Sequence, residues 1–232
     1  MVETLAENMK RFPRKDHRFT VVHFAVSTEE QVKALGEMGA IVTANPYYVN
    51  ALADKYSEFG LGPSRADNMV RLGSVASKGM ILALHSDMPM APADPLFLAW
   101  CAAERLNVQE NRVAARNQRI SIERALSGVT IESAYCLGLE NEIGSIKPQK
   151  KANFAILEDD PMDVKRFQDK PDNRLDNRPI LKDVGVWGCV FEGKKFHLEP
   201  EKEAASEIPI LPTEINLHQT KDQLLALAST RG

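Results

Sequence analysis

Apolar runs of strand length alternate with stretches of helical period over the first half of the chain. Three runs are rich in β-branched, aromatic or other apolar residues, at 19–26, 40–44 and 80–84. Continuous apolar strands separated by helices are typical of parallel βα units, in which both faces of the sheet are covered. The pattern therefore predicts an α/β fold with three parallel strands, which are too few to close a barrel.

Local signals predict where several helices begin and end. Ser27–Glu30 has the composition of a capping box, and the helix that follows carries Val32, Leu35 and Met38 at helical spacing before Gly39 ends it. Further helices are expected at 65–76, from the cap Asp94 and first-turn Pro95 to about residue 105, at 121–126 and at 130–139.

The pattern changes after residue 143. A strand at 152–157 and a hairpin at 184–196, with its turn near Gly193, predict antiparallel β-structure. From residue 199 the chain is acidic and punctuated by prolines, which indicates a peripheral tail with a short helix at its end. We therefore expect three parts, namely 1–143, 144–198 and 199–232.

Composition and charge exclude some classes of protein. Hydrophobic residues at 44% and charged residues at 26% are ordinary for a soluble globular protein. The 29 basic and 32 acidic residues give a net charge of −3 and do not gather into a basic stripe, so nucleic acid is not an expected partner. The longest apolar runs are far too short to cross a membrane, so no membrane partner is expected.

Two further features bear on the compartment. The opening segment is polar and helix-like, without the apolar core and small-residue cleavage site of a secretory signal. Cys101, Cys136 and Cys189 are odd in number and lie in apolar surroundings, which favours buried free thiols over disulfides or a metal cluster. A cytoplasmic location is the expectation.

Polar residues stand at the carboxyl ends of two predicted strands. His23 lies near the end of the first strand, and His85 and Asp87 follow the third. In parallel βα folds these strand ends meet at the face where the loops assemble the site. Imidazole nitrogen and carboxylate oxygen suit zinc, although a lone histidine is more often a hydrogen-bonded core residue and Asp87 would also serve as a turn cap.

Three segments together point to a known family: 16–23 (DHRFTVVH), 84–89 (LHSDMP) with Asp94-Pro95-Leu96, and 144–146 (GSI) followed by 151–157 (KANFAIL). In order and spacing they resemble the C-terminal half of the amidohydrolase superfamily. The most similar group is the amidohydrolase family 3 type, which includes exoenzyme regulatory proteins. The resemblance covers about residues 10–195 and implies the C-terminal part of a TIM-type (β/α)8 barrel, followed by part of a small β-sandwich.

The resemblance also implies roles for individual residues. His23 matches the metal-site histidine at the end of the sixth barrel strand, and Asp87 matches the eighth-strand aspartate that binds metal and activates water. His85 stands where the family often has glycine, so its imidazole contacts substrate or fills the pocket edge. Asn45, Tyr47 and Arg65 are candidate substrate-binding residues, with a turn as the alternative role of the first two and a surface salt bridge as that of Arg65.

The family's remaining ligands have no counterpart in the sequence, which contains no His-x-His. A catalytic zinc ordinarily takes three protein ligands, so tight metal binding by this chain alone is not expected. We therefore expect a fragment, inactive alone, of a zinc-dependent hydrolase acting on carbon–nitrogen bonds other than peptide bonds. The alternative is a non-catalytic regulatory or binding protein that retains the fold. Expected partners are a small amide-like substrate and either a complementary N-terminal half or further copies of the chain.

Overall fold

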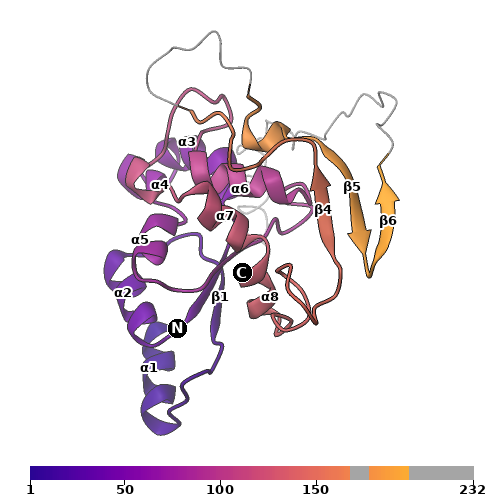
Figure 1. Cartoon of the computed structure of the whole chain (residues 1–232). Coiled ribbons are helices and arrows are strands. Elements are labelled where there is room, and N and C mark those ends of the chain that lie inside the picture. The colour runs from indigo at the N-terminus through magenta and orange to yellow at the C-terminus, as the bar shows by residue number, and fades with distance from the viewer. Residues whose placement is uncertain (168–177, 199–232) are drawn as a thin grey trace, which may run out of the picture. The chain divides into compact units, whose positions relative to one another are not determined.

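The structure is a computed structural model that describes residues 1–167 and 178–198. The predicted tail at 199–232 lies outside these residues. Two three-stranded sheets organise the described part (Figure 1). One sheet is parallel and comes from the first half of the chain, and the other is antiparallel and comes from residues beyond 150.

The parallel sheet confirms the α/β fold expected from the sequence. Its strands β1 (Thr20–His23), β2 (Ile41–Ala44) and β3 (Leu82–Leu84) lie in the order of the chain, with Val21 beside Val42 and Ala44 beside Leu84. The outer two strands are shorter than the apolar runs predicted. β1 ends at His23 because His23 and Phe24 have φ angles of 65° and 52°, which no extended strand can continue.

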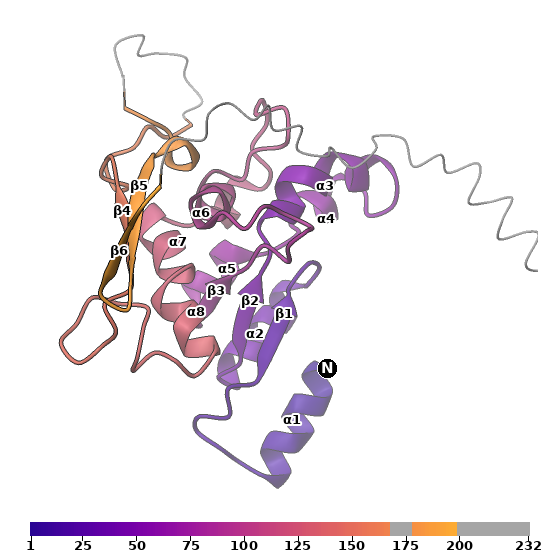
Figure 2. The same cartoon turned by 90° about the vertical axis from the view of Figure 1, so that its right-hand side faces the viewer.

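Helices connect the three strands. α2 (Glu29–Glu37) joins β1 to β2, and α3 (Tyr47–Glu58), α4 (Pro63–Asp67) and α5 (Leu72–Ser77) lie between β2 and β3. α2 and α5 contact each other on one side of the sheet (Figure 2). They bury the apolar residues Val32, Leu35, Leu72 and Val75.

The structure corrects three details of the predicted helices. The capping box of α2 is formed by Thr28 and Gln31, one residue later than predicted, because the Thr28 hydroxyl accepts from the Gln31 backbone N–H. The predicted helix at 65–76 is split into α4 and α5, since Val70 has a φ of 49°. α3 was not predicted at all.

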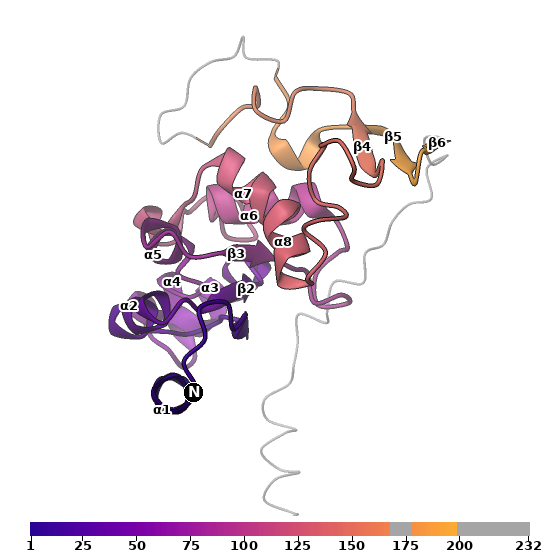
Figure 3. The ribbon, with the colours of Figure 1, turned by 60° about the horizontal axis from the view of Figure 1, so that its bottom comes forward.

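Later helices flank β3. α6 (Pro95–Glu104) begins at the predicted cap, where Asp94 accepts from the backbone of Leu96 and Phe97. α7 (Ile122–Gly128) and α8 (Ile131–Cys136) both contact β3 (Figure 3). A further short helix, α1 (Val2–Arg11), precedes β1 and contacts α2.

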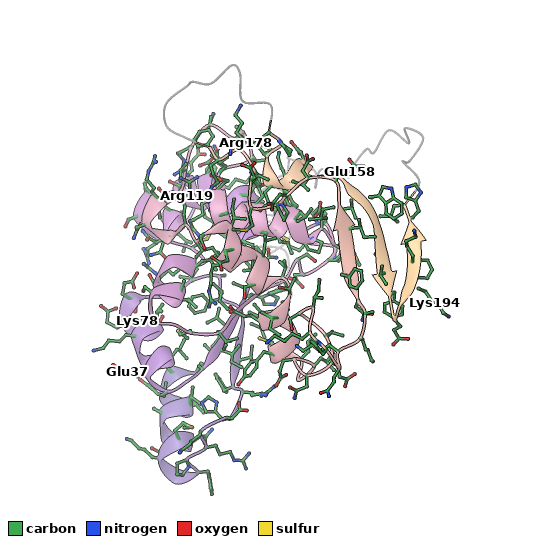
Figure 4. All side chains as sticks on the ribbon, viewed as in Figure 1. Glu37, Lys78, Arg119, Glu158, Arg178 and Lys194 are labelled. Atoms are coloured by element: carbon green, nitrogen blue, oxygen red, sulfur yellow. The ribbon has the colours of Figure 1, made fainter. Side chains whose placement is uncertain are left out.

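The antiparallel sheet consists of β4 (Phe154–Leu157), β5 (Val186–Phe191) and β6 (Lys194–His197). β5 and β6 form the predicted hairpin, with the labelled Lys194 at its turn (Figure 4). Gly188 is required in β5, because a Cβ there would lie 2.3 Å from the Phe196 carbonyl oxygen. The 3-10 helices η1 (Arg116–Gln118) and η2 (Leu181–Asp183) complete the described elements, and η2 contacts α6.

Two further features concern the cysteines and the helices. The three cysteines are free thiols, with Cys101 buried and Cys136 and Cys189 half-buried. Among residues 1–167 and 178–198, no helix is both long and apolar enough to cross a membrane.

Candidate active site

The candidate site lies at the carboxyl ends of the parallel strands. His23 is the last residue of β1, and His85 and Asp87 follow β3. The fold brings these three side chains together: His23 Nδ1 lies 3.7 Å from Asp87 Oδ2, and the His23 and His85 ring centroids are 5.0 Å apart. Chain segments that are distant in sequence thus share one small cluster.

Two imidazole nitrogens in this cluster have no hydrogen-bond partner. His23 Nδ1 and His85 Nε2 are both buried atoms without a donor or acceptor in reach. The 3.7 Å separation from Asp87 is too long for a hydrogen bond to His23. Buried polar atoms are normally paired, so two orphaned nitrogens side by side indicate that a further group belongs there.

The backbone at these positions is unusual. His23 and Asp87 have φ angles of 65° and 55°, in the left-handed region that residues other than glycine seldom adopt. Each such residue costs about 1–3 kcal/mol and persists only where the surroundings hold it. Conformations of this kind concentrate at functional sites, which supports the assignment of the cluster as a site.

The surroundings of His85 favour its neutral form. Burial lowers the pKa of His85, and the neighbouring His23 lowers it further, while the Asp87 carboxylate acts in the opposite direction. A neutral imidazole keeps a lone pair on one ring nitrogen, which is the form that binds a metal or accepts a proton.

Tyr48 belongs to the same cluster, although the sequence did not single it out. Its ring centroid lies 6.2 Å from that of His23. Burial raises the pKa of Tyr48, and the charge of Asp87 and a hydrogen bond to it raise the pKa further. The Tyr48 hydroxyl therefore stays protonated at neutral pH and interacts with the Asp87 carboxylate. The available sequence signal was its place in the first turn of a helix that follows a strand end.

Asn45 fastens two loops of the site together. Its side-chain N–H donates to the Ser86 carbonyl at 3.0 Å, and its side-chain oxygen accepts from the Tyr47 backbone N–H at 3.0 Å. Asn45 is completely buried. Both polar ends of the amide are thus used within the protein, in agreement with the turn role that the sequence left open.

Tyr47 and Arg65 make their contacts with residues outside the cluster. The Tyr47 ring packs against Phe97 of α6 at 5.8 Å, and burial raises the pKa of its hydroxyl. Arg65 is exposed on α4, and its Nε donates to the Leu61 carbonyl at 3.1 Å. No hydrogen bond or ring contact in the described part of the chain joins either residue to His23, His85 or Asp87. Their substrate-binding roles stay predictions.

The donors of the cluster match part of a metal site. Imidazole nitrogen and carboxylate oxygen are the ligands that zinc and similar ions take in hydrolases. Within residues 1–167 and 178–198, however, no three histidine, cysteine, aspartate or glutamate side chains are arranged to hold an ion. The residues present fit a metal as part of a ligand set and do not complete one.

Comparison with known proteins identifies the family, because the profile of the Amidohydrolase family matches residues 1–195. The chain belongs to the amidohydrolase family. This confirms the resemblance seen in the sequence. The narrower likeness to exoenzyme regulatory proteins stays a prediction.

Individual relatives are much longer than this chain. Protein LONG AFTER FAR-RED 3 of Arabidopsis thaliana is 29% identical over 144 residues, which cover 62% of this chain and 24% of the relative. The N-substituted formamide deformylase of Arthrobacter pascens is 23% identical over 157 residues, which cover 68% and 29%. The matched part of the chain therefore spans less than a third of the length of these relatives.

A solved structure agrees with the fold. An uncharacterized metal-dependent hydrolase from Pyrococcus horikoshii OT3 aligns with a TM-score of 0.57 at 24% identity, covering 70% of this chain and 32% of that one. At this identity the likeness supports the α/β fold of the amidohydrolases, and the chemistry has to be argued from the site.

Proposed function

We propose that this chain is part of a metal-dependent hydrolase that cleaves carbon–nitrogen bonds other than peptide bonds. The main support is that two buried imidazole nitrogens, His23 Nδ1 and His85 Nε2, lack hydrogen-bond partners beside the Asp87 carboxylate. Family membership supplies the reaction class. Unpaired imidazole nitrogens at the strand ends favour a catalytic protein over a non-catalytic one, because leaving buried polar atoms unpaired destabilises a fold unless they bind a ligand.

The metal would be held by His23 and Asp87 together with ligands from outside the described residues. Zinc is the ion that best suits imidazole and carboxylate donors, and a catalytic zinc takes three protein ligands and keeps one position open. When bound, such an ion lowers the pKa of a water molecule and polarises the carbonyl under attack. The chain alone is expected to hold the ion weakly.

Asp87 would act as the general base and acid. It would take a proton from the attacking water and return it to the leaving nitrogen, a role that fits a carboxylate beside the Tyr48 hydroxyl. His85 would contact the substrate carbonyl or its leaving group from the neighbouring position. Asn45 would keep the loop that carries Asp87 in place, and Tyr47 and Arg65 are the more distant candidates for contacts with a small amide-like substrate.

The architecture proposed for the whole protein is a TIM-type barrel with a β-sandwich. β1, β2 and β3 would be the sixth to eighth strands of the barrel, and the sheet within 144–198 would be part of the sandwich. This assignment agrees with parallel strands in chain order and with relatives of which this chain matches less than a third. The chain alone would then lack turnover and would associate with a complementary N-terminal half or with further copies of itself.

The test is metal analysis and hydrolysis of N-formyl and cyclic amide substrates by the assembled protein. We expect about one divalent ion per active site. Asp87→Asn should lower kcat by at least about 100-fold. Asp159→Asn, which changes an exposed carboxylate after β4, is the matched control and should leave kcat unchanged. Absence of bound metal, together with full activity of Asp87→Asn, would refute the proposal.

A further inference from the structure

Two segments meet at the amino-terminal end of the parallel strands, opposite the candidate site, and we call them the basal segments. One, residues 10–19, comprises the end of α1 and the loop before β1, and the other, residues 137–151, follows α8 (Figure 1, Figure 2). Arg18 fastens them together, since its guanidinium donates to the Tyr135 carbonyl at 3.0 Å and to the Glu140 carboxylate at 2.6 Å. The same guanidinium lies 4.1 Å from the centroid of the Tyr135 ring.

The basal segments carry strongly exposed apolar residues. Among residues 1–167 and 178–198, the three large apolar residues with the greatest exposure are Ile146, Leu137 and Phe12, at 83%, 72% and 70%. Single apolar residues on a surface are ordinary, but here the three most exposed ones lie on two segments that are fastened together. Exposed apolar residues gathered at one end of a protein indicate an interaction surface.

The basal segments are also strongly basic. They contain eight basic and three acidic residues, although the whole chain has a net charge of −3. Ion pairs occupy all three acidic residues, because Asp16 and Glu140 pair with Arg18, and Glu142 pairs with Lys151. Four exposed basic side chains make no ion pair or hydrogen bond with any residue that the structure describes: Lys10, Arg14, Lys15 and Lys147.

A role within the fold accounts for one of these four unpaired cations. Lys10 lies in the last turn of α1, where a positive charge stabilises the helix dipole. Arg14, Lys15 and Lys147 lie outside the helices, so this reason does not apply to them. Unpaired cations beside exposed apolar residues are complementary to a partner surface that is negatively charged outside and apolar beneath.

We propose that the basal segments bind the surface of an anionic lipid bilayer. Phe12, Leu137 and Ile146 would enter the boundary between head groups and acyl chains, and the unpaired cations would lie against the head groups. Affinity for a bilayer increases with the apolar area buried in it, and each Lys or Arg near an anionic surface adds a factor of about five. Separate exposed side chains suit a deformable surface, because a rigid protein partner would have to match the shape around each of them.

This contact differs from a membrane span. No helix among the described residues could cross a bilayer, and the sequence expectation of no membrane partner concerned such spans. The candidate site would face away from the lipid, because His23, His85 and Asp87 stand at the other end of the strands. The inference is independent of the proposed hydrolase.

The test is flotation of the 232-residue chain with lipid vesicles, because vesicles carry bound protein upward whereas aggregates sediment. The chain should float with vesicles of phosphatidylcholine and phosphatidylserine in equal amounts. Vesicles of phosphatidylcholine alone should bind it at least about tenfold more weakly. Raising the ionic strength from about 0.1 M to about 1 M shortens the Debye length from about 10 Å to about 3 Å and should weaken anionic binding by at least about tenfold.

Matched variants show whether the basal segments make the contact. Lys15→Glu should weaken binding to the anionic vesicles by at least about fivefold, and Phe12→Ser by at least about threefold. Lys55→Glu and Phe59→Ser are the controls and should bind as the parent chain does. Both change exposed positions at the end of α3, which lies far from α1 (Figure 1). Circular dichroism checks that all four variants are folded.

Three results would overturn the proposal. One is a chain that does not float with the anionic vesicles at low ionic strength. Another is a folded Lys15→Glu or Phe12→Ser chain that binds them as tightly as its control. The third is soluble polyglutamate that displaces the vesicles and binds equally well to Phe12→Ser, because the basal segments would then recognise acidic polypeptides and not lipid.

Discussion

His23 Nδ1 lies 3.7 Å from Asp87 Oδ2, and both residues have a left-handed backbone although they follow different strands. Each conformation costs about 1–3 kcal/mol, so other interactions of the folded chain must offset this strain. The contact is too long for a hydrogen bond, and His23 Nδ1 has no other partner. His23 and Asp87 are therefore held close together without a hydrogen bond between them, which is the arrangement expected of two side chains that bind a common ligand.

Tyr48→Phe tests whether the tyrosine hydroxyl positions Asp87. Removing a hydrogen bond to a charged group costs about 1.5 kcal/mol, so kcat of the assembled hydrolase should fall about tenfold with little change in KM. Tyr56→Phe on the same helix, where the tyrosine is 42% exposed, is the matched control. Equal kcat values for the two variants would show that the hydroxyl does not act on Asp87.

Asn45→Ala tests the link between the loops that follow β2 and β3. The change leaves the Ser86 carbonyl and the Tyr47 N–H without their partner, so the free energy of unfolding should drop by about 1–3 kcal/mol. Asn8→Ala, at an exposed position in α1, should lower it by less than about 0.5 kcal/mol. Urea denaturation of the two variants measures the difference, and equal midpoints would contradict the link.

Arg105→Met tests a buried guanidinium whose hydrogen-bond partners all lie outside the candidate site. Arg105 is 1% exposed and donates to the backbone carbonyls of Ala114, Val70, Asp67 and Met69 at 2.8–2.9 Å. Methionine fills a similar volume but leaves these acceptors unpaired, so we expect a loss of about 3–5 kcal/mol. Arg65→Met removes a single exposed contact and should cost less than about 0.5 kcal/mol. Similar unfolding midpoints for the two variants would show that the carbonyl cluster does not depend on Arg105.

Cys136 predicts a pH dependence of stability. Burial, followed by the charge of Glu132, raises the pKa of the Cys136 thiol from its ordinary value near 9 to about 11. The folded state therefore retains a proton that the unfolded state loses, and this contribution to stability is complete below pH 9 and disappears as the pH rises through 11. Two pKa units correspond to about 2.7 kcal/mol, and solvent around the half-buried thiol reduces the contribution to about 1–2 kcal/mol.

The comparison of the parent chain with Cys136→Ala isolates this thiol from other groups that titrate at high pH. The free energy of unfolding of the parent should fall more steeply than that of the variant between pH 9 and 11. Parallel curves over this range would contradict the prediction.

Much of the architecture was determined by the sequence alone. Apolar runs of strand length located β1, β2 and β3, and the Asp94-Pro95 pair located the start of α6, because these signals depend on neighbouring residues. The polar residues at the strand ends followed from the same pattern. Family resemblance gave His23 and Asp87 their expected roles.

Tertiary structure decided the rest. Strand register and the left-handed turns brought His23, His85 and Asp87 together, and the first turn of α3 added Tyr48, which the sequence had not singled out. Long-range hydrogen bonds made Asn45 a loop anchor and closed the β3 edge with Glu132. Contacts between segments far apart in the chain leave no local pattern, so only the folded arrangement shows them.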